Sequence, residues 1–223
     1  MLVVHHLNNS RSQRILWLLE ELGVPYDIRR YQRNAKTLLA PPELKAVHPL
    51  GKSPVVVEDD GQVLAESGAI IEHLADRYAG GKLARPHGSP ARFQYIYWLH
   101  YAEGSAMPPL LLKLMFDKIL AAPMPFFARP IVRRIHEGAM SAFIGPQLKL
   151  HLDYLEGELA SREWFVDGEF SAADVQMSYP VESAVARAGL NDTRPRLVAW
   201  LRRVHERPAY LRAIERGGPY GSV

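Results

Sequence analysis

The segment LVVHHLNNSRSQRILWLLEELGVPYDIRRY, residues 2–31, decides the fold of this chain. Its first apolar run, 2–7, suits a buried strand, and a polar turn follows it. Ser10 and Gln13 then match a capping box, which predicts that Ser10 caps an amphipathic helix. After a glycine and a proline, residues 26–31 read as a second strand. A strand, a helix and a strand in this order predict a parallel pair with a right-handed crossover.

The next fifty residues extend this unit. A short helix is expected near 42–47, within a long polar connection. Two short strands, 53–57 and 63–65, flank an Asp-Gly pair that is typical of a hairpin. A further helix is expected at 67–78. The sequence therefore predicts a small mixed α/β sheet with helices in residues 1–80.

Beyond this sheet the chain reads as helix. The glycine- and proline-containing segment 81–90 is the best linker, and residues 91–223 form the predicted all-helical domain. Pro108 and Pro109 are expected to kink a long helical stretch. Ser171 and Asp174 match a second capping box.

Composition excludes several classes of function. The 223 residues carry 27 basic and 24 acidic side chains, and a net charge of +3 does not indicate a nucleic-acid partner. No apolar run approaches the ~20 residues of a membrane span, and the start of the sequence lacks the pattern of a signal peptide, so we expect no membrane partner and a cytoplasmic location. The chain has no cysteine, which excludes an enzyme thiolate as nucleophile or metal ligand. The spacing of its nine histidines indicates no metal site.

Four motifs together carry a resemblance to a known family. Residues 5–26 resemble the first strand and helix of the cytosolic glutathione S-transferases, closest to the bacterial and fungal branch with Ser-Arg-Ser after the first strand. The segment HPLGKSPVV, 48–56, is similar to the family's cis-proline segment, and LAESGAII, 64–71, to its glutamate-serine turn. FSAAD, 170–174, is similar to the capping motif of its helical domain.

This resemblance implies a thioredoxin-like glutathione-binding domain followed by an all-helical domain. It also implies a homodimer that uses glutathione as co-substrate and no metal. The enzyme would stabilise the glutathione thiolate and add it to a small hydrophobic electrophile. Two alternatives stay open: a glutathione-dependent peroxidase or disulfide reductase that works without an enzyme cysteine, and a non-catalytic binding protein of the same fold.

Three neighbouring residues compete for the contact with sulfur. From the local sequence, Ser10 is an N-cap, but the resemblance places its hydroxyl beside the glutathione thiolate. Asn9 is the main alternative, since an amide N–H also donates to sulfur, and Ser12 is a third. Arg11 would add positive field at the site, unless it is a solvated side chain of the first turn.

The resemblance assigns the tripeptide to five further positions. Ser53 would pair through its backbone with the cysteinyl unit beside a cis Pro54, and Lys52 would meet the glycine carboxylate. Ser67, at a helix N-terminus, would hold the γ-glutamyl carboxylate, and Glu66 the ammonium. Solvated or capping roles for these side chains stay open.

The helical domain is expected to supply the remaining contacts. Glu103 would reach across a dimer to the glutathione ammonium, or would be a surface carboxylate. An adaptable apolar electrophile pocket is expected from aromatic and methionine side chains, which would otherwise belong to the core. Its candidates are Tyr97, Tyr101, Met107, Leu111 and Phe116.

Overall fold

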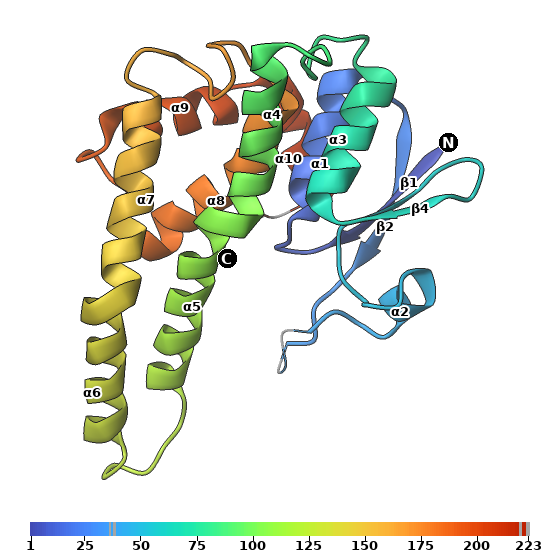
Figure 1. The fold of residues 1–223 in the computed structure, drawn as a ribbon. Helices are drawn as coiled ribbons and strands as arrows, with labels where there is room; N and C mark the ends of the chain where they lie inside the picture. The colour runs from blue at the N-terminus through green and yellow to red at the C-terminus, as the bar shows by residue number, and fades with distance from the viewer. Residues whose placement is uncertain (36, 38, 219, 222–223) are drawn as a thin grey trace.

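The computed structural model describes residues 1–35, 37, 39–218 and 220–221 and shows a small sheet packed against a larger helical part (Figure 1). In chain order the elements are β1 (Leu2–Leu7), α1 (Ser12–Leu22), β2 (Tyr26–Tyr31), α2 (Glu43–Val47), β3 (Val55–Val57), β4 (Val63–Ala65), α3 (Ser67–Tyr78), α4 (Pro90–Tyr101), η1 (Ala102–Ala106), α5 (Met107–Ala121), α6 (Arg129–Ala139), η2 (Met140–Ile144), α7 (Gly145–Glu158), α8 (Ala172–Ala188), α9 (Pro195–His205) and α10 (Pro208–Gly217). The two segments named η are π-helical.

The sheet has the order β2-β1-β3-β4. β1 and β2 run parallel, with Leu2 opposite Tyr26, as the strand–helix–strand pattern predicts. β3 is antiparallel to both β1 and β4, and the β3–β4 hairpin turns at Gly61, whose φ of 88° favours glycine. The prediction of a mixed α/β sheet followed by helices is confirmed.

The start of α1 differs from the prediction. The helix begins at Ser12, and Arg11 occupies the N-cap position without a side-chain hydrogen bond. The capping box with Gln13 is not formed. The Ser10 hydroxyl instead accepts a hydrogen bond from the Ser12 N–H at 3.2 Å. The chain reaches this turn through Asn9, which has a φ of 48°, so the local backbone departs from simple helix entry.

The irregularity in the long helical stretch after the linker lies just before the two prolines at which the sequence predicted a kink. The π-helical segment η1 joins α4 to α5 without interrupting the helical backbone, since the Met107 N–H donates to the Ala102 carbonyl, and the two prolines follow in the first turn of α5. The irregular turn therefore directly precedes Pro108 and Pro109. π-Helical turns are frequent at functional sites, and η1 carries Glu103.

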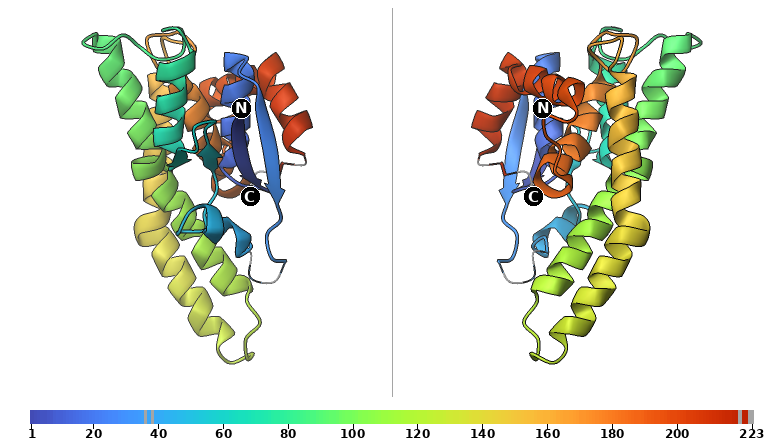
Figure 2. Two further views of the ribbon diagram at one scale, coloured as in Figure 1. Left: turned by 90° about the vertical axis from the view of Figure 1, so that its right-hand side faces the viewer. Right: turned by 90° about the vertical axis from the view of Figure 1, so that its left-hand side faces the viewer.

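Helices α1 and α3 lie between the sheet and the helical part, where both contact α8 (Figures 1 and 2). The capping box at Ser171 and Asp174 starts α8 as predicted. Buried apolar side chains form one continuous cluster that runs from β1 to α10. The division into domains 1–80 and 91–223 with a linker at 81–90 stays a prediction.

Within the described residues, no helix combines the length and the apolar character that a membrane crossing requires.

Candidate functional site

Two adjoining hollows open at the end of β1 beside the start of β3. They share Arg11, Leu50, Lys52 and Ser53, and their volumes are about 320 and 410 Å³. We call the first the acidic hollow; it is lined by Arg11, His48, Leu50, Lys52, Ser53, Pro54, Val55, Ala65, Glu66, Ser67 and Glu103. We call the second the basic hollow; it is lined by Leu7, Ser10, Arg11, Arg33, Leu39, Ala40, Pro42, Lys45, Leu50, Gly51, Lys52 and Ser53. The two hollows together bring most of the predicted binding residues to one cleft.

Carboxylates distinguish the two hollows. The acidic hollow contains those of Glu66 and Glu103 beside the shared cations Arg11 and Lys52, and Arg11 is paired with Glu103. The basic hollow carries Arg11, Arg33, Lys45 and Lys52, and none of its described lining residues is acidic. A ligand that spans both hollows would therefore place an ammonium in one and an anionic group in the other.

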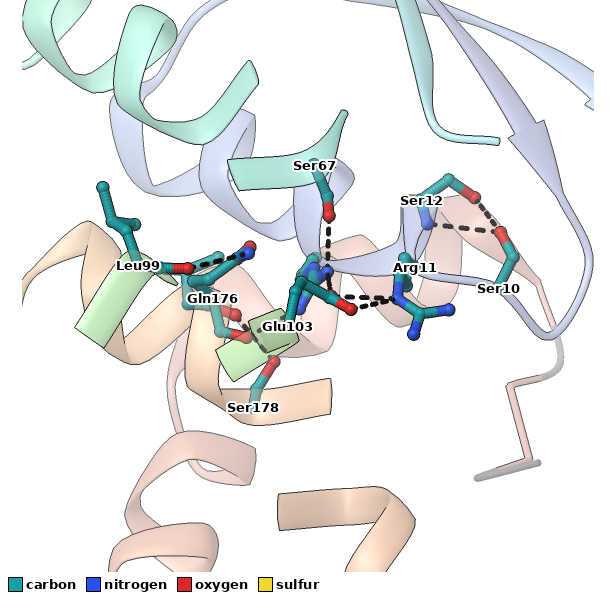
Figure 3. A network of polar contacts seen from close by, with 10 residues as sticks. Ser10, Arg11, Ser12, Ser67, Leu99, Glu103, Gln176 and Ser178 are labelled. Atoms are coloured by element: carbon teal, nitrogen blue, oxygen red, sulfur yellow. Dashed lines mark hydrogen bonds and ion pairs between the residues drawn. The ribbon is translucent and has the colours of Figure 1, made fainter. Parts of the chain in front are cut away.

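A buried chain of hydroxyls and one imidazole lies behind the cleft. The Ser10 Oγ is 2.7 Å from the Ser12 Oγ (Figure 3). The Ser12 Oγ in turn lies 2.9 Å from the His6 Nδ1. Burial lowers the pKa of His6 to about 4, with Arg30 acting in the same direction, while a hydrogen bond to the backbone of Gly217 opposes them. The imidazole is therefore neutral at pH 7.

Ser10 and Ser12 differ in access to the cleft. Ser10 is buried but lines the basic hollow. Ser12 is fully buried, and its hydroxyl also contacts the carbonyl of Leu7 at 3.3 Å. Asn9 lines neither hollow; its Oδ1 accepts from the N–H of Gly221, and its carbonyl accepts from Arg33.

Glu103 joins η1 to the first helix of the sheet domain. The single Nε–H of Arg11 is shared between the two oxygens of the Glu103 carboxylate, at 2.9 and 3.1 Å (Figure 3). The carboxylate also accepts a hydrogen bond from the buried Arg14. Burial raises the pKa of Glu103, but Arg14 and Arg11 outweigh this effect and hold it below its usual value. The carboxylate is therefore ionised and faces the acidic hollow.

Arg14 also reaches the start of α3. Its Nη2 donates to the Ser67 Oγ at 2.6 Å, and its Nη1 donates to the Gln176 carbonyl at 2.7 Å. Because the arginine donates to Ser67, the proton of that hydroxyl is available to another acceptor. Glu66, just before the helix, has a φ of 70° and an exposed carboxylate. Glu66 holds the N-cap position of α3, so Ser67 is not the cap.

The segment before β3 forms another wall of the cleft. The Ser53–Pro54 peptide bond is cis. The Ser53 hydroxyl donates to the His5 carbonyl at 2.9 Å and accepts from the Leu7 N–H at 3.3 Å, which attaches this segment to β1. Lys52 is exposed beside it and lines both hollows.

The five candidates for an electrophile pocket do not line one common hollow, although the rings of Tyr97 and Tyr101 stack at 5.6 Å. Tyr97 lines a separate hollow with Phe93 and Tyr154, and the Tyr101 hydroxyl lies 2.6 Å from the His151 Nδ1. Met107 is buried, Leu111 is exposed and Phe116 is partly buried on α5. None of the five lines the acidic or the basic hollow.

Sequence reasoning missed three cations that the structure places at or beside the cleft: Arg14, Arg33 and Lys45. The position of Arg14 inside an apolar helix is a weak signal of a buried ion pair, and its partner lies 89 positions away. The polar connection before β3 has no periodic pattern, so the sequence did not indicate which way the side chains of Arg33 and Lys45 point. Among the described residues, no group of three or more potential metal ligands is present.

Comparisons with known proteins agree with this architecture. The family model for the glutathione S-transferase N-terminal domain matches residues 10–77, and the model for the C-terminal domain matches residues 124–208. Glutathione S-transferase 3 of Schizosaccharomyces pombe is 40% identical over 217 residues, which cover 97% of this chain and 88% of that protein. Glutathione S-transferase 1 of Saccharomyces cerevisiae is 33% identical over 226 residues, 98% of this chain and 96% of that protein.

A solved structure supports the same assignment. A glutathione S-transferase from Actinobacillus pleuropneumoniae superposes with a TM-score of 0.80 at 34% identity, covering 97% of this chain and 93% of that one. The sequence relatives, the matched domains and the shared architecture lead to one conclusion: this chain belongs to the glutathione S-transferase family.

Proposed function

We propose that the chain binds glutathione across the acidic and basic hollows, ionises its thiol and adds the thiolate to a small hydrophobic electrophile. The observation that carries this proposal is the acidic hollow. It combines two carboxylates with a serine at a helix N-terminus and with the backbone of Ser53. These groups complement the ammonium, the carboxylate and the peptide unit of a γ-glutamyl-cysteinyl ligand.

The γ-glutamyl end would occupy the acidic hollow. Ser67 would donate its hydroxyl proton to the γ-glutamyl carboxylate, because its oxygen already accepts from Arg14. The free N–H groups and positive dipole end of α3 favour the same anion. Glu66 and Glu103 would receive the ammonium. The cysteinyl backbone would pair with Ser53 in the manner of an added strand.

The glycine end would extend into the basic hollow. Lys52 was expected to meet its carboxylate, and Lys45 and Arg33 line the same hollow. These exposed contacts to a single carboxylate would be weakened by salt.

Ser10 is the proposed donor to the sulfur. A free thiol has a pKa of about 8.5, and lowering it to about 6.5 requires roughly 2.7 kcal/mol of preference for the anion. One charge-assisted hydrogen bond and the N-terminus of α1 together have this magnitude. The hydroxyl of Ser10 is already within hydrogen-bond distance of Ser12. A thiolate would displace this neutral contact because a charge-assisted hydrogen bond is about twice as strong.

Asn9 stays the alternative donor to the sulfur. The full burial of Ser12 and its contacts with His6 and Leu7 favour a supporting role for it. Arg11 borders both hollows and would add positive field near the sulfur.

The reaction would depend on proximity and on thiolate stabilisation. No covalent intermediate with an enzyme thiol is available, because the chain has no cysteine. For the electrophile pocket, Leu111 has an exposed apolar side chain on α5, directly after η1. Met107 and Phe116 on the same helix, and Tyr97 and Tyr101 on α4, remain proposals.

The test compares glutathione conjugation of a chloronitroarene by wild type, Ser10→Ala and Asn9→Ala. We expect turnover by wild type, a loss of more than about tenfold in Ser10→Ala and a smaller loss in Asn9→Ala. A hydroperoxide and a mixed glutathione disulfide serve as parallel substrates to separate the alternative reactions. Absence of both turnover and thiolate absorbance in wild type would contradict the proposal, and absence of glutathione affinity in calorimetry would favour a non-catalytic protein.

A homodimer in the cytoplasm completes the proposal. A third hollow between α3 and α4 includes Ala69 and Glu72 beside Glu66 and Glu103, so a partner on this face would border the acidic hollow. Light scattering tests the dimer. A monomeric enzyme with full activity would contradict a contribution of the partner to the site.

A further inference from the structure

The helices α5 and α6 form a hairpin that projects away from the rest of the molecule (Figures 1 and 2). The hairpin turns at residues 122–128, and α6 buries none of its side chains. We define the hairpin tip as Phe126, Phe127, Ile131 and Ile135 with the neighbouring Arg129, Arg133 and Arg134.

The apolar side chains of the hairpin tip face solvent. Phe126 is 89% exposed and Phe127 is 67% exposed, and the two rings contact each other edge to face. Ile131 and Ile135 follow one turn apart on α6 and are also mostly exposed. Large apolar groups that gather at a convex end, rather than singly, mark an interaction surface.

The hairpin also carries the excess positive charge of the chain. Residues 107–144 contain five of the 27 basic residues and two of the 24 acidic ones, so they hold a net +3 and the remainder is balanced. Arg129, Arg133 and Arg134 are exposed, and no ion pair joins any of them to another described residue. Of the two acidic residues, Asp117 forms hydrogen bonds with Lys113 and His136. Glu137 lies one helical turn after Arg133.

We propose that the hairpin tip docks on the surface of an anionic lipid bilayer. The phenylalanines and isoleucines would enter the boundary between headgroups and acyl chains, and the arginines would contact lipid phosphates. This mode of binding requires no membrane-spanning helix. It joins an exposed aromatic turn with cations that have no acidic partner, and an anionic bilayer complements both.

A second copy of the chain fits this surface less well. A twofold contact brings the same patch of each subunit together, and that patch must be complementary to itself. The hairpin offers three exposed arginines but only Glu137 as an exposed carboxylate outside the Asp117 pairs, so it lacks the acidic partners that its arginines would need. A bilayer instead accommodates a convex apolar tip without a matching groove and supplies negative charge around it.

The experiment measures co-sedimentation of the full chain with vesicles of phosphatidylcholine and phosphatidylglycerol, and with vesicles of phosphatidylcholine alone. We expect binding to the anionic vesicles that weakens as salt rises, and much weaker binding to the neutral ones. The double variant Phe126→Ser/Phe127→Ser should lose at least about tenfold in affinity for anionic vesicles. Arg133→Gln/Arg134→Gln should lose about tenfold or more in affinity for anionic vesicles and should keep only a small preference for them, due to Arg129.

The matched control is Phe93→Ser, which removes an exposed phenylalanine on α4, outside the hairpin. This control should bind as wild type does. Glutathione turnover should be unchanged in both hairpin variants, which separates this proposal from the proposed function. The proposal would be overturned if wild type ignored anionic vesicles at low salt, or if the Phe126/Phe127 variant bound normally. It would also be overturned if that variant turned a dimer into a monomer in light scattering, since the tip would then be an interface between copies.

Discussion

Two hydrogen-bonded carboxylates, the fully buried Asp174 and the partly exposed Glu103, show how one chain uses the same chemistry for stability and for binding. Asp174 accepts hydrogen bonds from the Ser171 N–H and Oγ, the Phe165 N–H and the Trp200 Nε1, at 3.0–3.1 Å. All of these donors belong to the helical part. The carboxylate is fully buried and contacts no hollow. We call this group the closed cluster.

Glu103 belongs to what we call the open cluster, with Arg11, Arg14 and Ser67. Its side chain is about one-third exposed, at 32%, and faces the acidic hollow. The two arginines reach it from α1, so the cluster connects the two parts of the molecule. In the closed cluster the carboxylate accepts hydrogen bonds only from the protein and so stabilises the fold. In the open cluster the carboxylate also faces a hollow, where it can accept hydrogen bonds from a ligand.

The largest expected effect is a loss of stability when the closed cluster is disrupted. Asp174→Asn places an amide N–H₂ among hydrogen-bond donors, and we expect a loss of about 3–5 kcal/mol in the free energy of unfolding. Urea unfolding measures it. The control Asp153→Asn removes an exposed aspartate that pairs with Lys149 and Arg194 and should cost less than about 1 kcal/mol. Equal losses in the two variants would remove the distinction between the clusters.

A change in the open cluster should weaken binding of the ligand. Glu103→Gln should weaken glutathione binding between about tenfold and a hundredfold, because an ionised acceptor is lost from the hollow. Calorimetry measures the affinity. Glu72→Gln is the matched control, since the two side chains are similarly exposed, at 35% and 32%, and both pair with arginine. A Glu103 variant that binds glutathione as tightly as the control would contradict the proposed role of the open cluster.

The pH dependence of stability should also distinguish the two regions. His6 lies behind the cleft, whereas the closed cluster contains no histidine. The pKa of His6 falls from 6.5 to about 4 on folding. Between these values the unfolded chain binds a proton that the folded chain does not, so stability decreases as pH falls. From pH ~7.5 to pH ~5 the expected loss is about 2 kcal/mol.

The test measures urea unfolding at both pH values for wild type and His6→Asn. Burial also lowers the pKa values of His5 and His151, and these groups contribute with the same sign in both proteins. The difference in slope therefore isolates His6. Equal slopes would show that this imidazole is not kept neutral by the fold.

The smallest expected effect separates two serines that stand near helix starts. Ser10→Ala should raise the pKa of the bound glutathione thiol by about one unit, or ~1.4 kcal/mol. It should also cost about 1 kcal/mol of stability, because the buried Ser12 N–H loses its acceptor. Ser171→Ala should cost about 1–2 kcal/mol of stability and leave the thiol pKa unchanged. Thiolate absorbance as a function of pH gives the first quantity, and urea unfolding gives the second. A thiol pKa that shifts in Ser171→Ala and not in Ser10→Ala would exchange the roles of the two serines.

Local spacing predicted the closed cluster better than the open one. The capping box at Ser171 and Asp174 joins residues three positions apart, and the sequence pattern alone indicated it. At Ser10 the same pattern was wrong about the cap, because the hydroxyl bonds to Ser12 and the helix starts later. Apolar periodicity and the strand–helix–strand order predicted β1 and β2 and their parallel pairing.

The open cluster depends on contacts that no local pattern contains. Arg14 and Glu103 meet only after α1 packs against the helical part, 89 positions later in the chain. The resemblance to the family supplied Glu66, Ser67 and Ser53 as candidates, and the structure brings them to one hollow. It did not supply Arg14, which orients Ser67.

A crystal structure of the complex with glutathione tests the central claim most directly. The account predicts the γ-glutamyl end at Ser67 and Glu103, the glycine carboxylate in the basic hollow and the sulfur within about 3.5 Å of the Ser10 Oγ. A tripeptide bound elsewhere, or a sulfur that contacts Asn9 while Ser10 keeps its bond to Ser12, would contradict it.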